Sequence, residues 1–293
     1  TGFKMNNLTE LFCDVDDFYK NEQAQQSNLI SNRKRKRCFN MSVAEVSTLL
    51  ILFHSSGYRT LKEFYTVYVP LALSCEFPNR VSYTRFVELE QSVANFLARY
   101  LKSKMVESQG VAFADSTKIS VCNNRRINRH KTFQNRATRG KTSMGWFYGF
   151  KLHLIVDDLG QIVAFYVSAG NVDDRQGLRA MINGVKGKVF ADKGYISQSL
   201  KEELSNQGVD LIYRPRSNMK MTDKLSDFDS AILYKRSIIE TIYDQLKNLC
   251  QIEHTRHRSV LGFAANLFSG LLAYVWKTHK PSLNLRSTSM IIE

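Results

Sequence analysis

The stretch that decides the fold reads Gly187-Lys188-Val189-Phe190-Ala191-Asp192-Lys193-Gly194-Tyr195. A short apolar run ends in an aspartate, and a glycine turn and a helix-like segment follow it. An Asp at the carboxyl end of a buried strand lies where open α/β sheets bind their ligands. Strand-end Asp residues also cap helices, and for Asp192 taken alone that second interpretation is the better one.

Two further carboxylates interrupt segments that otherwise have the composition of a buried core. Asp115 lies in the apolar run 111–117, and Glu240 lies in the helical pattern 236–243. Burying a single charge without a partner is costly. Three buried carboxylates that converge are understandable if a divalent metal neutralises them. Asp115, Asp192 and Glu240 are therefore the candidate catalytic and metal-ligating residues.

Composition limits the classes of protein to which the chain can belong. With 293 residues, 43% of them hydrophobic, it can build a sizeable core. Its 41 Lys and Arg against 27 Asp and Glu give a formal charge of +14, which suits nucleic acid; the alternative is a basic protein without such a partner. The five cysteines form no CxxC pair, as expected of reduced thiols in a cytoplasmic, nucleoid-associated protein. The longest apolar stretch, 263–276, is too short to span a bilayer, so no membrane partner is expected.

The positive charge is concentrated in one part of the chain. From Ser116 to Val156 there is no Asp or Glu. One-sided charge beside an acidic site is typical of a surface that binds the DNA backbone, and much of it falls in a long loop. A run of five basic residues at 33–37 fits phosphate contact as well. The candidate DNA-binding residues of this region are Arg125, Arg126, Arg129, Lys131, Arg136, Arg139, Lys141 and Lys151.

The first third of the chain, residues 1–105, is predicted to be a mostly helical DNA-binding region. Helical patterns cover 8–30, 42–54, 60–68 and 82–101, and the second starts with the capping-box pair Ser42 and Glu45. Helix, glycine turn and helix are compatible with a helix-turn-helix module. Any small helical bundle gives the same pattern, so both interpretations stay open.

Residues 106–293 are predicted to form an α/β catalytic domain. Three strands linked by hairpins precede two strands that alternate with helices, which is the ribonuclease-H-like order with a mixed five-stranded sheet. In that order Asp115, Asp192 and Glu240 converge, and two divalent cations roughly 4 Å apart would serve an in-line phosphoryl displacement. Mg²⁺ suits such a site, and Mn²⁺ is expected to substitute. Strands are expected at 111–122, 146–157, 161–168, 188–192 and 209–213, and helices at 171–182, 197–207 and 236–249.

These residues resemble the bacterial insertion-sequence transposases of the DDE superfamily over about residues 111–280. The matching segments are 115–117, 145–153 and 192–195, with Arg236, Glu240 and Lys247. Relatives often carry Tyr three residues before the Arg, where this chain has Leu233, so no role is transferred to a tyrosine. Membership implies cleavage at element ends and strand transfer by the freed 3′-hydroxyl. It also implies element terminal inverted repeats and target DNA as partners. Strand transfer brings two ends together and the sequence supplies one active site per chain, so a homodimer on DNA is expected.

Several residues near the candidate site allow two interpretations. Arg236, Glu240 and Lys247 share one helix face, where Arg236 and Lys247 would contact DNA phosphates; an exposed salt-bridged stripe is the alternative. His153 is expected either to support the metal site from behind or to be a core histidine. Asp173 and Asp174 are expected to be helix caps. Residues 217–235 form a polar insertion without an assigned role.

The sequence therefore predicts a metal-dependent DNA transposase. Two alternatives use the same scaffold, a catalytically silent DNA-binding regulator and a metal-dependent nuclease without strand transfer.

Overall fold

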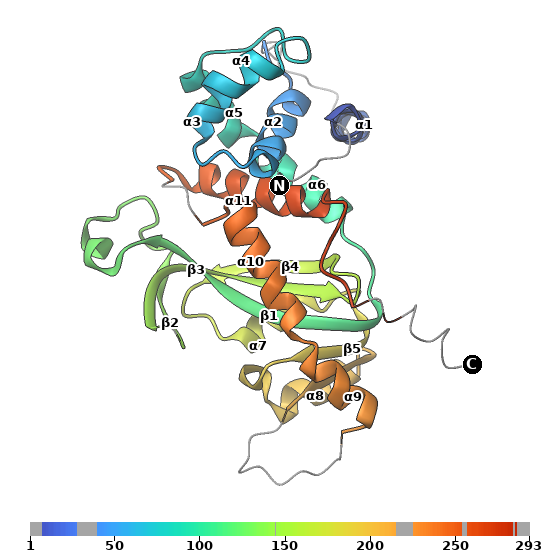
Figure 1. The fold of residues 1–293 in the computed structure, drawn as a ribbon. Coiled ribbons are helices and arrows are strands. Elements are labelled where there is room, and N and C mark those ends of the chain that lie inside the picture. Colours follow the sequence, from blue (N-terminus) through green and yellow to red (C-terminus); the bar gives the residue numbers. More distant parts are fainter. Residues whose placement is uncertain are drawn as a thin grey trace. The chain divides into compact units, whose positions relative to one another are not determined.

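The computed structural model describes residues 8–27, 40–143, 145–214, 225–253, 257–283 and 285. Its internal contacts divide the chain into two compact units: Thr1–Lys104 with Gln245–Thr278, and Met105–Asp244 with His279–Glu293. We call them the helical unit and the sheet unit, and describe each by itself (Figure 1). No helix within the described ranges is long and apolar enough to cross a membrane.

The helices of the helical unit begin where the sequence supplies caps. Ser42 and Glu45 form the predicted capping box before α2, and Gly57 ends that helix in the left-handed conformation at φ 78°. A single predicted helix at 82–101 is instead two helices, because a turn at Val93 separates them. The elements are α1 (Leu8–Ser27), α2 (Val43–Ser56), α3 (Leu61–Glu63), η1 (Phe64–Tyr68), α4 (Val69–Ala72), α5 (Tyr83–Ser92), α6 (Ala94–Ser103), η4 (Gln245–Leu249) and α11 (Val260–Val275).

Helix α11 is the centre of the helical unit. It packs against α2, α5 and α6, and most of its residues are buried. A helix that is apolar on nearly all faces must be surrounded by other elements. The sequence analysis includes this C-terminal helix in the same domain as the strands, whereas its contacts group it with the N-terminal helices, whose apolar faces enclose it.

The sheet unit has six strands in the order β2-β3-β1-β5-β6, and β4 pairs with β3. Strand β3 is antiparallel to both β1 and β4, whereas β5 runs parallel to β1 and β6 runs parallel to β5. This is the predicted ribonuclease-H-like arrangement, and it contains all five predicted strands. The bounds are β1 (Gln109–Cys122), β2 (Thr138–Thr142), β3 (Gly145–Asp157), β4 (Ile162–Ala169), β5 (Lys186–Ala191) and β6 (Val209–Tyr213).

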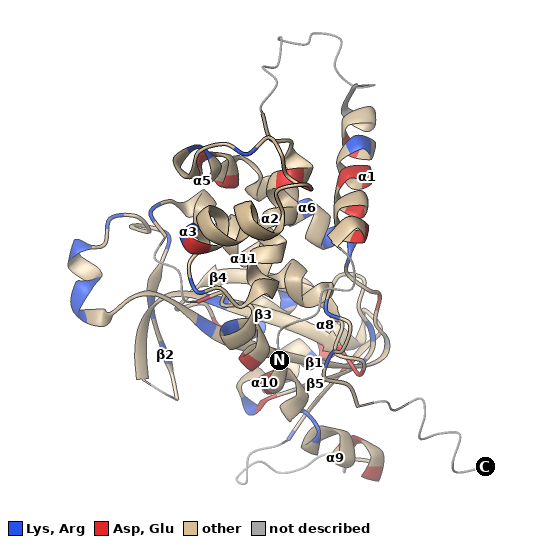
Figure 2. Cartoon of the chain, turned by 45° about the horizontal axis from the view of Figure 1, so that its top comes forward, with Lys and Arg blue, Asp and Glu red and all other residues tan. Residues whose placement is uncertain are grey.

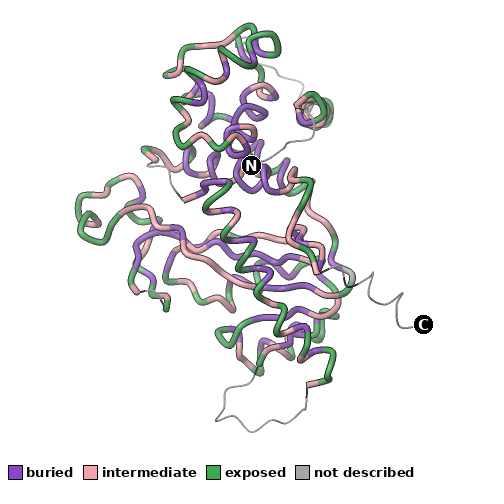
Figure 3. The backbone as a smooth tube through the Cα atoms, viewed as in Figure 1, coloured by how far each residue is buried: buried purple, intermediate pink, exposed green. Residues whose placement is uncertain are grey.

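Short helices flank this sheet, and the strands between them are largely buried (Figure 3). Residues from β1, β5, β6, α7 and α8 share one apolar cluster, in which Ala114, Val189 and Leu178 are almost fully buried. Within the predicted polar insertion 217–235, residues 217–224 lie outside the described part, and the remainder includes α9. The basic run 33–37 also lies outside it. The helical elements are η2 (Asn124–Arg129), α7 (Asp174–Met181), η3 (Lys193–Tyr195), α8 (Gln198–Ser205), α9 (Asp227–Tyr234) and α10 (Ser237–Asp244).

Candidate active site

Two of the three candidate acids lie next to each other because their strands are paired. The parallel register of β1 and β5 ends with Ala114 opposite Ala191. Asp115 and Asp192 are the next residues on the two strands, and β5 has ended when the chain reaches Asp192. Carboxyl ends of parallel strands are where α/β sheets present ligand-binding groups. The side chain of Asp115 is 22% exposed and that of Asp192 is 57% exposed.

The third acid comes from α10, which is fixed on β1 by a tyrosine. The hydroxyl of Tyr243 donates a hydrogen bond to the Asp115 carbonyl oxygen at 2.6 Å and lies 3.3 Å from the Leu152 carbonyl oxygen. Tyr243 is buried, so this contact attaches the helix to two adjacent strands. Glu240 lies one turn before it on α10, with its side chain 60% exposed.

A single guanidinium connects all three acids. Arg236 directly precedes α10, and its Nη1 lies 3.3 Å from Asp115 Oδ2. Its Nη2 lies 3.1 Å from Glu240 Oε1 and 3.8 Å from Asp192 Oδ1. The three carboxylates, which are far apart in sequence, therefore surround one cation. Arg236 is 18% exposed, so this charge is shielded from solvent better than an ordinary surface pair.

The electrostatics of Asp115 differ from those of an ordinary aspartate. Burial, with smaller contributions from the charges of Asp192 and Asp174, raises the pKa of Asp115 to about 6, although the Ser116 backbone N–H and Arg236 oppose the shift. The Ser116 N–H donates to Asp115 Oδ1 at 2.8 Å. Burial also raises the pKa of Tyr195 well above its usual value, and Asp115 adds to that shift. The site therefore concentrates negative charge that an added cation would relieve.

The donor set fits a hard divalent cation. Three carboxylates from three elements supply only oxygen ligands, which Mg²⁺ and Mn²⁺ prefer, and Arg236 shows that a positive group is accommodated among them. Within the described residues, no three or more His, Cys, Asp or Glu side chains are gathered tightly enough to form a ready-made metal cluster. Arg236 contacts each acid, so the carboxylates face the guanidinium.

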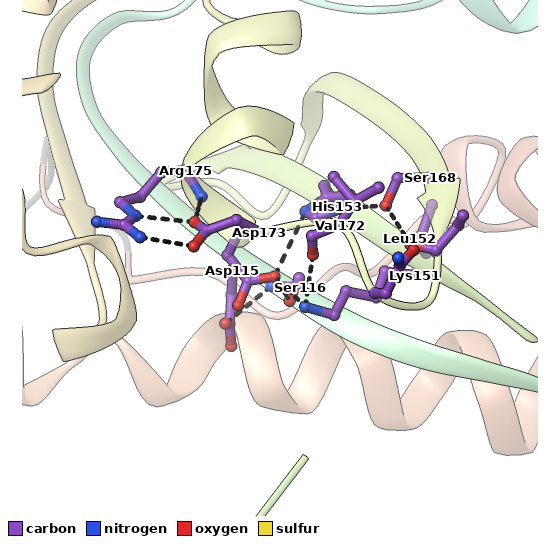
Figure 4. Close-up of polar contacts among 12 residues, drawn as sticks. Asp115, Ser116, Lys151, Leu152, His153, Ser168, Val172, Asp173 and Arg175 are labelled. Carbon is purple, nitrogen blue, oxygen red and sulfur yellow. Dashed lines mark hydrogen bonds and ion pairs between the residues drawn. The ribbon is translucent and has the colours of Figure 1, made fainter. Parts of the chain in front are cut away.

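A second polar group lies behind Asp115. Lys151 and His153 on β3 both approach Asp174: Lys151 Nζ donates to Asp174 Oδ1 at 2.9 Å, and His153 Nδ1 is 3.9 Å from that oxygen. The ends of Ser116 and Lys151 meet beside Asp115 (Figure 4). His153 is fully buried, its Nε2 is 2.8 Å from Ser168 Oγ, and burial lowers its pKa to about 4.

The neighbouring residue Asp173, and not Asp174, caps α7. The Asp173 carboxylate accepts from the Arg175 backbone N–H at 2.9 Å and pairs with its side chain, and that pairing lowers the pKa of Asp173 to about 2. The expectation that both residues are caps is therefore wrong for Asp174. Sequence reasoning misses Asp174 because a polar residue at a helix start is usually explained by capping.

The basic loop between β1 and β2 is an ordered platform. Phe133 is 1% exposed and packs edge-on against Phe150, and the His130 ring stacks on Phe133. Asn124 of η2 donates to the Trp146 carbonyl oxygen at 2.8 Å and so connects the loop to β3. In Figure 2 the Lys and Arg positions of this loop are coloured blue, at the left of the picture near β2. Seven of the predicted DNA-binding residues are exposed here: Arg125, Arg126, Arg129, Lys131, Arg136, Arg139 and Lys141.

Three predicted cations of the site have different surroundings. Arg236 lies among the acids, as described above. Lys151 is 12% exposed and also donates to the Val172 carbonyl oxygen at 2.9 Å, so two of its three donors are used inside the sheet unit. Lys247 belongs to η4 in the helical unit and pairs with Glu253 at 3.1 Å.

Comparisons with known proteins identify the family of the chain. A family model described as "Transposase DDE domain" matches residues 105–260, which is more than half of the chain. The chain belongs to the DDE transposases. No curated protein matches it in sequence. As a DDE transposase it is a DNA-processing enzyme of transposition, and DDE domains in general use divalent metals.

Solved structures confirm the fold. The chain is similar to the piggyBac transposase in a synaptic complex with hairpin DNA, with a TM-score of 0.52 and 10% identity, over 96% of this chain and 74% of that chain. A mariner transposase, Mos1, in a paired-end complex with Mn, is matched at a TM-score of 0.24 and 10% identity, over 90% and 87%. At that score the second similarity carries no weight, and the first supports the ribonuclease-H-like fold alone.

Proposed function

We propose that this DDE transposase cleaves the ends of an insertion sequence and joins the freed 3′-hydroxyl to target DNA, with Asp115, Asp192 and Glu240 holding divalent cations. One observation carries the proposal: carboxylates from β1, the end of β5 and α10 converge on Arg236. Three acids that face one cation in a DDE transposase are the groups best suited to bind metal. Two ions per site and Mg²⁺ as the natural metal, with Mn²⁺ as substitute, are parts of this proposal.

The residues of this chain perform the remaining tasks. Bound divalent cations would activate the attacking oxygen and stabilise the leaving oxygen of the phosphodiester. Asp115 is held by the Ser116 N–H and Asp192 directly follows a buried strand, so two ligands have fixed backbones. Arg236 is placed to contact a phosphate once its carboxylate partners bind metal. Phosphoryl transfer requires mainly alignment and charge stabilisation, and fixed carboxylates and cations supply both.

DNA binding is assigned to the platform of η2 and β2. Its exposed arginines and lysines would contact backbone phosphates without selecting sequence. The piggyBac structure contains hairpin DNA, which supports DNA as the partner of this fold in the present chain. The terminal inverted repeats of the element and the target are the two DNA substrates that the proposal requires.

The test is cleavage and joining of a DNA fragment that carries the element's terminal inverted repeats, with Mn²⁺ or Mg²⁺. Wild-type protein should nick the ends and join them to a target plasmid. Asp192→Asn should abolish cleavage and keep DNA affinity, because the basic platform is unchanged. Asp210→Asn is the matched control, since Asp210 is an exposed aspartate on β6.

Each result separates the proposal from its alternatives. Binding without cleavage under any metal would identify a silent regulator. Cleavage without joining would identify a nuclease. If Asp192→Asn cuts at the wild-type rate, the assignment of the three carboxylates is wrong.

A further inference from the structure

Asp174 makes polar contacts with three side chains of the sheet, although it does not cap α7. Its Oδ1 accepts from the Ser116 hydroxyl at 2.7 Å and from Lys151 Nζ at 2.9 Å, and lies 3.9 Å from His153 Nδ1. These partners come from β1 and β3, the two strands behind the candidate active site. One carboxylate at the start of α7 therefore connects three side chains of the central sheet.

Gly177 allows α7 to approach the sheet this closely. A Cβ atom at position 177 would lie 2.3 Å from His153 Nδ1, a separation that no real side chain tolerates. Without a side chain there, the first turn of α7 rests directly on the His153 ring. Asp174 lies three residues earlier on the same helix face, so the glycine places its carboxylate over Ser116 and Lys151.

Ser116 connects Asp174 to the candidate metal ligand. Its hydroxyl donates to Asp174, and its backbone N–H donates to Asp115 Oδ1. Fixing the Ser116 side chain therefore restrains the backbone that orients the Asp115 carboxylate. The bond from Lys151 is charge-assisted and only 12% of that side chain is exposed, so it is stronger than an ordinary surface pair.

We propose that Asp174 is a positioning residue of the active centre, which orients Asp115 by holding Ser116 and Lys151. The inference rests on the proposed function, because it assigns Asp115 to metal binding. Asp174 itself touches neither DNA nor metal in this assignment. Partners that hold metal ligands in place typically change metal affinity or activity by about 10–100-fold when they are removed.

The adjacent aspartate supplies a matched control. Asp173 has the same side chain and lies one residue earlier, but it caps α7 and pairs with Arg175, with both side chains more than 40% exposed. Asp173→Asn should therefore cut DNA and bind Mn²⁺ like the wild type. Any effect confined to Asp174 cannot come from helix capping.

The experiment measures three quantities on the full chain: single-turnover cleavage at saturating DNA, Mn²⁺ affinity by titration, and the melting temperature. Asp174→Ala should slow cleavage and weaken Mn²⁺ binding by about 10–100-fold, with DNA affinity unchanged. Asp174→Asn keeps an oxygen acceptor for Ser116 and Lys151, so it should recover part of both losses. Ser116→Ala combined with Asp174→Ala should be no slower than Asp174→Ala alone, because both act through one contact.

The outcomes are distinct. Wild-type Mn²⁺ affinity in a folded Asp174→Ala protein overturns the proposal, whether or not the wild type cleaves DNA. Absence of cleavage by the wild type overturns the proposed function, and the Mn²⁺ titration still decides the role of Asp174. Asp174→Ala can also lower the melting temperature and still bind Mn²⁺ like the wild type when it is assayed at a temperature at which it is folded. That result shows that Asp174 has a purely structural role, and it also overturns the proposal.

Discussion

At the scale of single residues, Arg236 explains how three carboxylates coexist in the folded chain. Like charges at short range repel and raise one another's pKa values, and burial already disfavours the ionised form of Asp115. One guanidinium within 4 Å of all three offsets this repulsion. A divalent cation would offset it more strongly, so Arg236 and metal have partly overlapping roles in stability.

Replacing Arg236 by Met should therefore destabilise the metal-free protein and enlarge its response to metal. The loss of charge-assisted hydrogen bonds should cost on the order of 1–3 kcal/mol. The increase in melting temperature on adding Mn²⁺ should exceed that of the wild type. In the variant the three carboxylates have lost their guanidinium partner, so a cation bound to the folded state relieves more repulsion. Arg179→Met is the control: it breaks an exposed pair with Glu203, and should change neither quantity. An unchanged or smaller metal response would contradict this account.

The same scale shows what sequence could and could not identify around the site. Asp115, Asp192 and Glu240 are visible in the sequence because burying a carboxylate inside an apolar run is costly and requires a reason. The expected burial is found only at Asp115, because the side chains of Asp192 and Glu240 are 57% and 60% exposed. Asp174 is hidden because its neighbour Asp173 has an identical side chain and a sufficient local explanation as a cap. Only the contacts of β1 and β3 distinguish the two, and those contacts join residues 58 and 23 positions apart along the chain.

At the scale of elements, the position of α7 depends on one glycine. Gly177→Ala should force α7 away from His153, because the new methyl group would overlap the ring. Overpacking of this kind costs about 1–3 kcal/mol, and here it should also slow cleavage by displacing Asp174. Chemical unfolding followed by circular dichroism measures the first effect. Gly110→Ala on β1 is the control, since no atom lies within 4 Å of its Cβ position, and equal stability of the two variants would refute the argument.

Five strands of the sheet were predictable from the sequence, whereas β2, which lies in the connection between β1 and β3, was not. Runs such as Val189 to Ala191 and the turn at Gly160 identify strands and hairpins locally. The segment Thr138–Thr142 contains Arg, Gly and Lys in place of alternating apolar residues, so its pairing with β3 has no signal in sequence. The break at Val93 between α5 and α6 likewise contains neither Gly nor Pro. Tertiary packing decides both cases.

The basic platform should determine how binding responds to salt. Replacing Arg125, Arg126 and Arg129 by Ala should weaken binding to all DNA sequences alike, since backbone contacts carry no sequence information. Each lost phosphate contact should reduce the slope of log affinity against log salt by about 0.9. Fluorescence anisotropy at several salt concentrations measures this slope. A loss confined to element ends would show instead that η2 contacts bases.

At the scale of the whole molecule, local sequence patterns and tertiary contacts answer different questions. Capping pairs and alternation locate elements within each unit, but they do not say which unit an apolar helix joins. Val260–Val275 shows the difference: its composition requires burial, and only its packing against α2, α5 and α6 places it in the helical unit. Helix-turn-helix DNA reading by that unit stays a prediction, because a helical bundle satisfies the same packing.

The assembly on DNA is the last prediction, and it follows from counting sites. The described residues of one chain bring a single set of three carboxylates together around Arg236. Strand transfer of an element needs chemistry at two ends held close together. If each chain acts on one end, the active complex must contain at least two chains. Light scattering coupled to size exclusion, on protein bound to paired terminal repeats, should give a mass of two protomers or more.

Mixed assemblies sharpen this test. Wild-type chains combined with an excess of Asp192→Asn chains should produce complexes that cut one end and leave the other intact, because each site acts on its own end. Asp210→Asn chains in the same excess should leave both cuts in place, since Asp210 is exposed on β6 and outside the contacts of Arg236. A complex with the mass of one chain that cuts and joins both ends would refute the prediction, and would require one set of carboxylates to act twice.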